Sequence, residues 1–347
     1  MDFTDNELAG VAPDRMAAAY MEYRRSCYDF IYRAAVANQI LDHLDKPATV
    51  EEFATRKGVV PSKVDVAGLL LDALVRCGAV SRSQEQPPRF TTSSDYAPSS
   101  SFDNELIRLA TGKRSYEELG YSDSFGRVVA SLTCEEKPAL AGFDASNIAL
   151  WEQGMQLPYY RYSRIQAVDT LVSAGSSLLD LASGSGLGLL ELAQRTAAYG
   201  DTTLLGVEIS PDFVRAAEER TASNPRIRVV QGDLERPLSF LDGYNFDGAM
   251  LVGAYHYLSN PAIMWESMAC LLRSGGVLCL AMAFSRTGSY DQELVKLRYA
   301  QRHPVAHARG RSEVITAAMA SGFELEREFW LGCFGWYAFR KQGPGAE

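Results

Sequence analysis

The amino-acid sequence predicts an α/β protein, with a parallel sheet and flanking helices in the second half of the chain and a mainly helical region before them. Three observations support this prediction. From residue 177 onward, short apolar runs alternate with amphipathic stretches, as they do in βαβ units. Several of the apolar runs end in an acidic residue, and a turn rich in glycine follows the first of them. Before residue 100, apolar residues recur at helical spacing.

The first predicted strand begins at residue 177 and ends in the acidic Asp180. Gly184, Gly186 and Gly188 then turn the chain into a helix. Glycine permits tight turns and a close approach of the backbone to a ligand, and a helix N-terminus presents free N–H groups. Because many nucleotide sites share a lone glycine run, the residues that follow it decide its meaning.

The next three strands are predicted over 203–209, 227–234 and 246–252. Glu208 closes the first of them, where a carboxylate can accept hydrogen bonds from both hydroxyls of a ribose. Asp233, with Leu234 beside it, closes the second, where an adenine amino group could donate to it. Open α/β sheets bind their ligands at the carboxyl ends of their strands, so these residues point to one site.

Taken in order, these motifs resemble the class I methyltransferases that use S-adenosylmethionine. The resemblance rests on Asp180 with its three glycines, Glu208, Gly232 followed by Asp233, the strand with Asp247 and the run 271–278. The glycine spacing differs from the dehydrogenase fingerprint, which also has no counterpart of Gly232 and Asp233. The resemblance implies a Rossmann-like domain with a seven-stranded sheet and S-adenosyl-L-methionine as cofactor. It assigns Asp180, Gly184 and Gly186 to the donor's amino acid end, Glu208 to the ribose, and Asp233 with Leu234 to the adenine.

Composition limits the remaining possibilities. A chain of 347 residues suggests two domains, and its net charge of −9 argues against nucleic acid, because phosphate binding requires clustered Lys and Arg. The six cysteines form no C-x-x-C pair and favour buried free thiols. The N-terminus is unlike a signal peptide and no apolar run is long enough to span a membrane. We therefore expect a cytoplasmic protein without a membrane partner.

The first hundred residues predict a helix, turn, helix and hairpin. A long helical pattern over 12–44 is stopped by Pro47, and Thr49 with Glu52 forms a capping-box signal for the next helix, which Gly58 ends. A further helix over 61–77 precedes two short strands, over 79–82 and 89–92. This is a winged-helix pattern.

A winged helix raises the possibility of a DNA-binding regulator. In the helix over 61–77, Lys63 and Arg76 are balanced by Asp65 and Asp72, which is a poor charge pattern for a recognition helix. The same order of elements resembles the N-terminal dimerisation domain of plant and bacterial small-molecule O-methyltransferases. That resemblance implies a homodimer in which this domain helps to roof the active site. It divides the chain into a dimerisation domain (1–100), a helical linker and roof (101–165) and a catalytic domain (166–347).

The segment 151–162 is crowded with aromatic residues. Its simplest interpretation is a core helix between the domains. In the resembling family this region lies over the methionine end of the cofactor, which makes Met155 and Tyr160 candidate cofactor contacts. Trp151 and Tyr159 are then candidate contacts for an aromatic acceptor.

His256 is the candidate general base. It follows the fourth strand by a short turn, where the resembling O-methyltransferases have their catalytic histidine, and a nearby base assists a phenol whose pKa is about 10. Those enzymes usually show His-Asp-Trp, whereas His256 is followed here by Tyr257 and Leu258. Tyr255 and Tyr257 flank the histidine and are candidate acceptor contacts.

A second histidine cluster lies in the loop that contains Arg302, His303 and His307. We expect a basic, solvated loop that attracts an acidic substrate, with Arg302 and His303 as candidate substrate contacts. No resident metal is expected. The alternative is a metal held by His256 with His303 or His307, as in some C-methyltransferases of this architecture that act on 2-oxo acids.

The end of the chain predicts two antiparallel strands, over 323–330 and 333–340. The favoured function is methyl transfer to the oxygen of a small phenol in secondary metabolism. Methylation of a phenol ring carbon needs the same deprotonation and stays open, as does the metal-assisted reaction on a 2-oxo acid. An enzyme that keeps the cofactor without transferring its methyl group is a further alternative. A winged-helix regulator is the least favoured.

Overall fold

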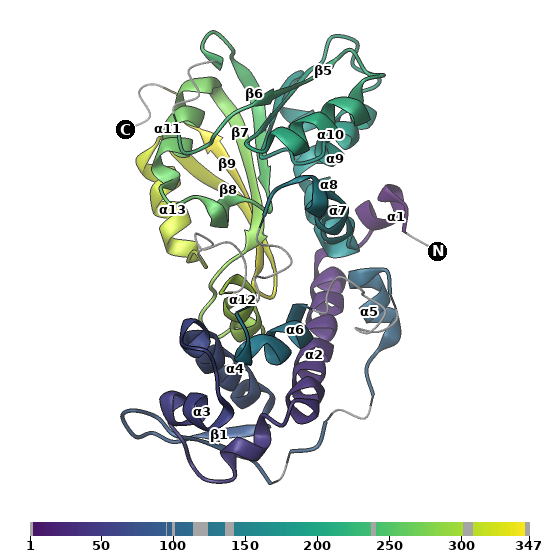
Figure 1. Ribbon diagram of the computed structural model, residues 1–347. Coiled ribbons are helices and arrows are strands. Elements are labelled where there is room, and N and C mark those ends of the chain that lie inside the picture. Colours follow the sequence, from purple (N-terminus) through teal and green to yellow (C-terminus); the bar gives the residue numbers. More distant parts are fainter. Residues whose placement is uncertain are drawn as a thin grey trace. The chain divides into compact units, whose positions relative to one another are not determined.

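The computed structural model describes residues 3–94, 96–98, 101–113, 124–135, 142–236, 241–300 and 308–343. Contacts divide the chain into two compact units, both assembled from segments that are distant in sequence (Figure 1). The larger unit comprises Asp2–Pro13, Gly142–Arg286 and Val305–Glu347, and the smaller comprises Asp14–Ala141 and Thr287–Pro304. The boundaries expected at residues 100 and 165 divide the chain into continuous segments, whereas these units interleave.

The larger unit is built on a seven-stranded sheet with the strand order β5-β4-β3-β6-β7-β9-β8. Its strands are β3 (Ser177–Leu181), β4 (Thr203–Glu208), β5 (Ile227–Gln231), β6 (Phe246–Val252), β7 (Leu272–Ala283), β8 (Phe323–Leu331) and β9 (Phe334–Lys341). The first five are parallel, and β9 runs antiparallel to both β7 and β8. The predicted seven-stranded α/β domain, with its antiparallel strands at the edge, is confirmed.

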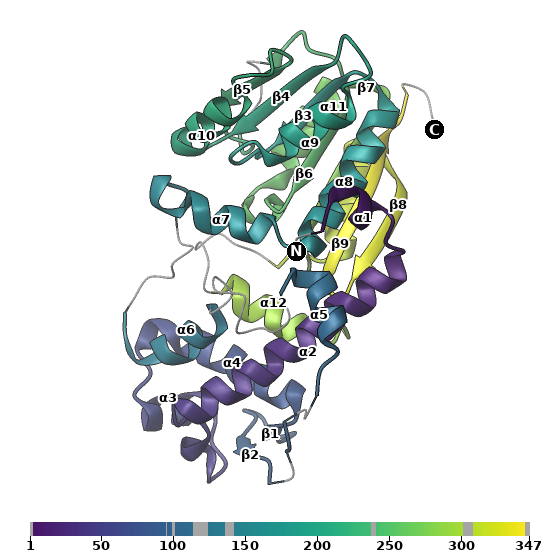
Figure 2. The same cartoon turned by 90° about the vertical axis from the view of Figure 1, so that its right-hand side faces the viewer.

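Helices cover both faces of this sheet (Figures 1 and 2). One face carries α8 (Pro158–Ala174), α9 (Leu187–Arg195) and α10 (Pro211–Thr221), and the other carries α11 (Pro261–Leu271) and α13 (Arg311–Ala320). The short helices α1 (Asp5–Ala9) and α7 (Ile148–Met155) also belong to this unit. Coverage on both faces explains why the central strands are apolar almost throughout.

The position of the site follows from the strand order. The chain runs outward from β3 to β4 and β5 and then returns to β6, so the order reverses between β3 and β6, which pair in parallel. The carboxyl ends of the strands at such a switch point leave a crevice in which open α/β sheets bind ligands.

The smaller unit is mainly helical. It contains α2 (Pro13–Ala37), α3 (Val50–Lys57), α4 (Val64–Cys77), β1 (Val80–Arg82), β2 (Phe90–Thr92), α5 (Asn104–Thr111), α6 (Ser124–Ala130) and α12 (Gln292–Tyr299). Strands β1 and β2 form the antiparallel hairpin expected from the sequence.

The long N-terminal helix ends at Ala37 rather than at residue 44, which corrects the sequence prediction. Gln39 adopts a left-handed conformation with φ of 57°. The Ile40 N–H then donates to Ala35 O at 2.9 Å and the Gln39 N–H donates to Val36 O at 3.0 Å. This pattern is a Schellman motif, which closes a helix by satisfying its last carbonyl groups. A separate 3₁₀ turn, Leu41–Leu44, follows.

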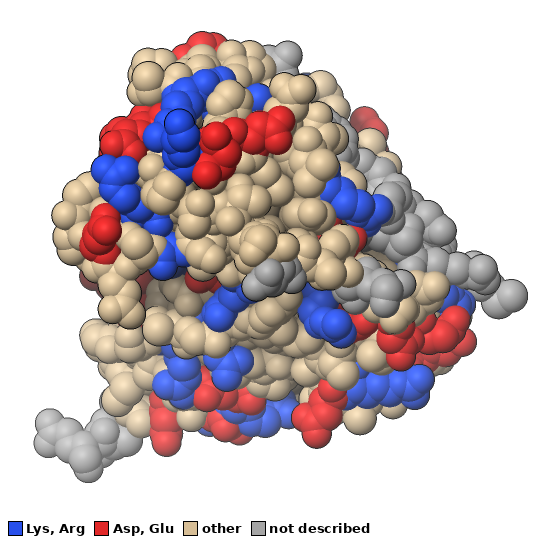
Figure 3. Space-filling view, turned by 90° about the horizontal axis from the view of Figure 1, so that it is seen from below, with Lys and Arg blue, Asp and Glu red and all other residues tan. Residues whose placement is uncertain are grey.

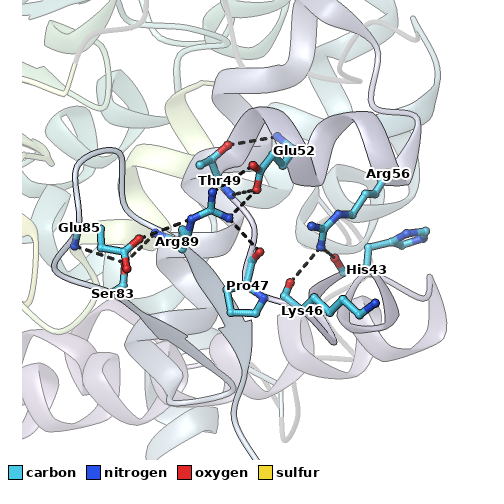
Figure 4. A network of polar contacts seen from close by, with 9 residues as sticks. All are labelled: His43, Lys46, Pro47, Thr49, Glu52, Arg56, Ser83, Glu85 and Arg89. Atoms are coloured by element: carbon cyan, nitrogen blue, oxygen red, sulfur yellow. Dashed lines mark hydrogen bonds and ion pairs between the residues drawn. The ribbon is translucent and has the colours of Figure 1, made fainter.

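The capping box predicted for the helix after Pro47 is confirmed. Thr49 Oγ1 accepts from the Glu52 N–H and the Glu52 carboxylate accepts from the Thr49 N–H, which completes the capping box of α3. The Arg89 guanidinium, from the hairpin, donates to both Glu52 oxygens at 2.9 and 3.2 Å and to Pro47 O at 3.2 Å (Figure 4). One carboxylate therefore caps the helix and also fastens the hairpin to it.

Helix α4, the counterpart of a recognition helix, packs against α12. Only Asp65 and Arg76 are exposed along it, and Arg76 donates to Glu293 at 3.2 Å and to Ser289 O at 2.7 Å. On the face drawn in Figure 3, the described Lys and Arg side chains lie among Asp and Glu rather than in a broad basic patch. None of the described helices is long and apolar enough to cross a membrane.

Candidate active site

The glycine turn between β3 and α9 is shaped by close approaches. Gly186 caps α9 in a left-handed conformation, with φ of 83°, and its N–H donates to Ser183 O at 3.0 Å. A β-carbon at Gly188 would lie 2.6 Å from Asp180 Oδ2 and 2.6 Å from Met250 Cε. Since real β-carbons essentially never approach so closely, only glycine fits at residue 188 without a shift of its neighbours.

Asp180 is buried at the end of β3. Burial raises the pKa of its carboxyl group to about 8, and the nearby Arg164 cation offsets only part of this effect. Arg164 itself donates to both oxygens of Glu191 at 2.6 Å and to Met155 O at 2.9 Å. A buried carboxyl group with a raised pKa is suited to receive a cationic ligand group, whose charge would favour the ionised form.

Glu208, at the end of β4, binds the glycine turn directly. Its carboxylate accepts from the Gly184 N–H at 3.0 Å and from the Ser210 N–H at 2.9 Å. Burial raises the pKa of Glu208, while these backbone hydrogen bonds favour its ionised form. A carboxylate offers about four lone-pair sites, so Glu208 can accept from a diol and hold the turn at the same time.

The third strand ends differently. Asp233 Oδ1 accepts from the Glu235 N–H at 2.9 Å, and the side chain is 31% exposed. Leu234 points into the apolar cluster beneath the sheet. Ile209, which directly follows Glu208, is 53% exposed and offers an apolar surface next to a polar strand end. The sequence analysis treats Ile209 only as the end of the strand over 203–209, since an isolated apolar residue at a strand end gives no distinctive signal.

Met155, Tyr160 and Gly253 lie together at the end of β6. Gly253 has φ of 82°, and a β-carbon there would lie 3.3 Å from Tyr160 Cε1 and 3.6 Å from Met155 Sδ. The Tyr160 ring also packs against Phe334, with ring centroids 4.9 Å apart. The fold thus places two predicted cofactor contacts beside the strand end that precedes His256. Phe334 and Gly253 had not been singled out as site residues.

His256 lies in a 3₁₀ turn, η7 (Tyr255–Tyr257), immediately after β6, and is only 1% exposed. Its ring lies 4.0 Å from the ring of Tyr257, centroid to centroid. Tyr257 in turn meets Phe143 edge-on at 5.1 Å, and Phe143 stacks on Trp151 at 5.2 Å. The histidine therefore adjoins an aromatic cluster formed by Phe143, Trp151 and Tyr257.

The two tyrosines that flank His256 have different surroundings. Tyr255 points into the core, where its hydroxyl oxygen accepts from the Trp265 indole N–H at 3.0 Å. Tyr255 therefore anchors the turn to the core, whereas Tyr257 packs against Phe143. Tyr159 is fully buried between Tyr160 and Phe334, with ring centroids 5.1 and 5.6 Å away.

The predicted histidine loop, with Arg302, His303 and His307, lies outside the described residues. The alternative metal set of His256 with His303 or His307 is therefore not described. Within the described part of the chain, no group of three His, Cys, Asp or Glu side chains is arranged to hold a metal ion.

Comparisons with known proteins identify the class. Residues 178–276 match the family model described as a methyltransferase domain. The CurJ carbon methyltransferase aligns over 98% of this chain and 96% of its own, with 15% identity and a TM-score of 0.65. The citrinin polyketide synthase CMeT domain aligns over 96% and 91%, with 13% identity and a TM-score of 0.68. An O-methyltransferase family protein from Burkholderia thailandensis aligns over 93% and 96%, with 18% identity and a TM-score of 0.51.

At these identities the solved structures establish a shared fold. A comparison with curated proteins gives no match. The family match and the fold together show that this chain carries a class I methyltransferase domain, and the cofactor is S-adenosylmethionine.

The residues present fit this cofactor. The glycine turn leads into α9, where a β-carbon at Gly188 would lie 2.6 Å from Asp180 Oδ2, and carboxylates lie at the ends of β3 and β4. Carboxylates suit the cofactor's ammonium group and ribose hydroxyls, and a helix N-terminus such as the start of α9 suits its carboxylate.

Proposed function

We propose that this protein transfers a methyl group from S-adenosylmethionine to the oxygen of a small phenol, with His256 as general base. The observation that supports this most is the place of His256. Its ring is buried beside Tyr257 at the carboxyl end of β6, next to the aromatic cluster of Phe143, Trp151 and Tyr257. Such a cluster suits a flat aromatic acceptor, because aromatic rings pack favourably edge-on or offset.

In this proposal Asp180, Gly184 and Gly186 hold the amino acid end of the cofactor, Glu208 binds the ribose and Asp233 the adenine. Met155 and Tyr160 line the methyl end, and Leu234, whose side chain packs in the core, belongs to the adenine side as the neighbour of Asp233 in the chain. When bound, S-adenosylmethionine supplies an electrophilic methyl group on a positively charged sulfur, which leaves as a neutral thioether.

The protein's own task is to position and deprotonate the acceptor. His256 would take the proton of the acceptor hydroxyl, and the bound cofactor would supply the methyl group to the oxygen that is left. Trp151, Tyr159 and Tyr257 position the acceptor ring, with Arg302 and His303 as contacts for an acidic substituent. Alignment of the reacting atoms can supply about 7–11 kcal/mol, and a positioned base contributes about 10²–10⁴ in rate.

Carbon methylation is the second candidate. It is favoured by the CurJ, DszA and citrinin polyketide synthase carbon methyltransferases, whose TM-scores of 0.65, 0.67 and 0.68 exceed the 0.51 of the O-methyltransferase family protein. The same base would then remove a proton from an activated carbon, and the carbanion or enolate carbon would take the methyl group.

One experiment separates the two candidates. The protein is incubated with S-adenosylmethionine labelled with ¹³C in the methyl group and with a panel of phenols and 1,3-dicarbonyl compounds. The methyl carbon of a methoxy product resonates far downfield of a carbon-bound methyl group in ¹³C NMR. Methoxy products support the proposal, carbon-bound products support the second candidate, and S-adenosylhomocysteine formation with neither product contradicts both.

A further inference from the structure

The turn that carries His256 continues into a short segment, Leu258, Ser259 and Asn260, that leads to α11. Glu235, from the loop after β5, holds this segment from one side. Its Oε1 atom accepts from Ser259 Oγ at 2.6 Å and from the Asn260 N–H at 2.7 Å. One carboxylate oxygen therefore fixes a side chain and a backbone amide of the segment.

Arg309 holds the same segment from another element. Its guanidinium donates to Leu258 O and, at 3.3 Å, to Ser259 O. Glu313, in the first turn of α13, accepts from Arg309 at 2.5 Å and keeps the cation in place. The Arg309 carbonyl accepts from the Ser285 N–H at 2.8 Å, which ties the arginine to the end of β7.

Glu235 is also hydrogen-bonded to Asp233, the residue proposed to bind the adenine. The Glu235 N–H donates to Asp233 Oδ1 at 2.9 Å, so the carboxylate proposed for the adenine and the segment after His256 are joined through one residue. Burial disfavours the ionised form of Glu235, but hydrogen bonds from Ser259 and Asn260 outweigh it and lower the pKa of the carboxyl group. Ionised acceptors make stronger hydrogen bonds than neutral ones.

We infer that Glu235 and Arg309 are positioning residues that hold the turn bearing His256, and that Glu235 links this turn to the adenine side of the site. The catalytic meaning of this inference rests on the proposed function, in which His256 is the base and Asp233 contacts the adenine. Neither residue needs to touch the acceptor. A displacement of about 1 Å at a reacting group can reduce a rate about 10²-fold, so the anchors of the turn matter to turnover.

The first test needs no acceptor. Hydrogen exchange of the peptide that spans 255–260 is measured with and without saturating S-adenosylhomocysteine in the wild type, Glu235→Ala and Glu235→Gln. Glu235→Ala removes the acceptor of the Asn260 amide, and we expect about tenfold faster exchange there without ligand. S-adenosylhomocysteine should slow exchange in the wild type and in Glu235→Gln, which keeps an acceptor oxygen, and only weakly in Glu235→Ala.

Controls keep the outcome decisive. Glu218→Ala, on the exposed side of α10, should behave like the wild type. Ser259→Ala removes one of the two hydrogen bonds and replaces Glu235→Ala if that variant does not fold. Calorimetry is used to check that each variant still binds S-adenosylhomocysteine. Equal slowing in Glu235→Ala and the wild type, or no slowing in the wild type, overturns the link to the adenine side.

Turnover then separates this inference from the proposed function. With any acceptor found in the panel, we expect kcat of Glu235→Ala to fall about 10–100-fold, with KM for the cofactor within about threefold and with a smaller loss of kcat in Glu235→Gln, which keeps a neutral acceptor oxygen. An unchanged kcat in Glu235→Ala, beside a large loss in His256→Ala, overturns the positioning role alone. An unchanged kcat in His256→Ala overturns the proposed base, whatever the exchange data show.

Discussion

Replacement of Glu208 by glutamine tests how the cofactor site is built. The Glu208 carboxylate accepts from two backbone N–H groups, at 3.0 Å from Gly184 and at 2.9 Å from Ser210. A glutamine side chain has one acceptor oxygen and one donor group, so one of these N–H groups would face another donor. The substitution keeps the size of the side chain and removes its charge and half of its accepting capacity.

The expected magnitude follows from these bonds. Leaving one buried N–H group unsatisfied costs about 1–3 kcal/mol, and hydrogen bonds to charged groups contribute about 1.5–3 kcal/mol each. The unsatisfied N–H group lowers the stability of the glycine turn in the ligand-free protein. The loss of the charged acceptor weakens the hydrogen bonds from the ribose hydroxyls and therefore lowers the affinity for the ligand. We expect the Kd for S-adenosylhomocysteine to rise about 10–100-fold, since about 1.4 kcal/mol corresponds to a factor of ten.

The assay is calorimetric titration of S-adenosylhomocysteine into the wild type and into Glu208→Gln, with thermal unfolding of both proteins alongside. Glu218→Gln, the same substitution at an exposed position on α10, is the control and should leave both measurements unchanged. A Glu208→Gln variant with a Kd within about twofold of the wild type would refute this reasoning, since the charge-assisted bonds would then contribute little.

Three further predictions concern the glycine turn, Asp180 and the helical unit. Gly188→Ala should lower both Tm and affinity for S-adenosylhomocysteine, because its β-carbon would lie 2.6 Å from Asp180 Oδ2, whereas Gly200→Ala, with nothing within 4 Å, should do neither. The ligand-free protein should lose stability as pH rises from about 4 toward 8. The pKa of Asp180 is about 8 in the folded state and about 3.9 in the unfolded state, so between these values only the folded state keeps the proton on this carboxyl group. Tm measured from pH 5 to 9 should therefore depend less on pH in Asp180→Asn, and an unchanged slope would contradict the raised pKa. Thr49→Ala should reduce the free energy of unfolding by about 0.5–2 kcal/mol in urea titrations, through loss of the cap on α3, and an effect no larger than that of Thr55→Ala would contradict this.

The sequence was sufficient where chain order alone decides position. Asp180 and Glu208 end neighbouring parallel strands, so their common edge of the sheet follows from the connectivity of βαβ units. The capping box of Thr49 and Glu52 was equally readable, because both partners lie within one helical turn. These predictions depend on local order or on a rule of topology.

The sequence was insufficient where a tertiary contact chooses between neighbours. Tyr255 and Tyr257 flank His256 alike in sequence. In the structure Tyr255 is hydrogen-bonded to Trp265 in the core, whereas the Tyr257 ring packs edge-on against Phe143. No periodicity distinguishes the two sides of so short a turn.

The same limit applies to residues that act from other loops, whereas the end of α2 has a local cause. Glu235 and Arg309 lie in separate loops, and only the folded sheet brings them to the segment after His256. Helix α2 ends through a left-handed Gln39, a residue that does not signal a helix end as glycine does.

The most direct test of the proposed mechanism is single-turnover methyl transfer by His256→Ala, with an acceptor found in the panel. Wild type and variant are mixed at saturating S-adenosylmethionine, and product is followed in rapid-quench samples while calorimetry with S-adenosylhomocysteine reports cofactor affinity. We predict a rate loss of about 10²–10⁴ with an unchanged Kd, as expected for removal of a general base. A variant that transfers methyl as fast as the wild type, with the same Kd, would contradict the assignment of His256.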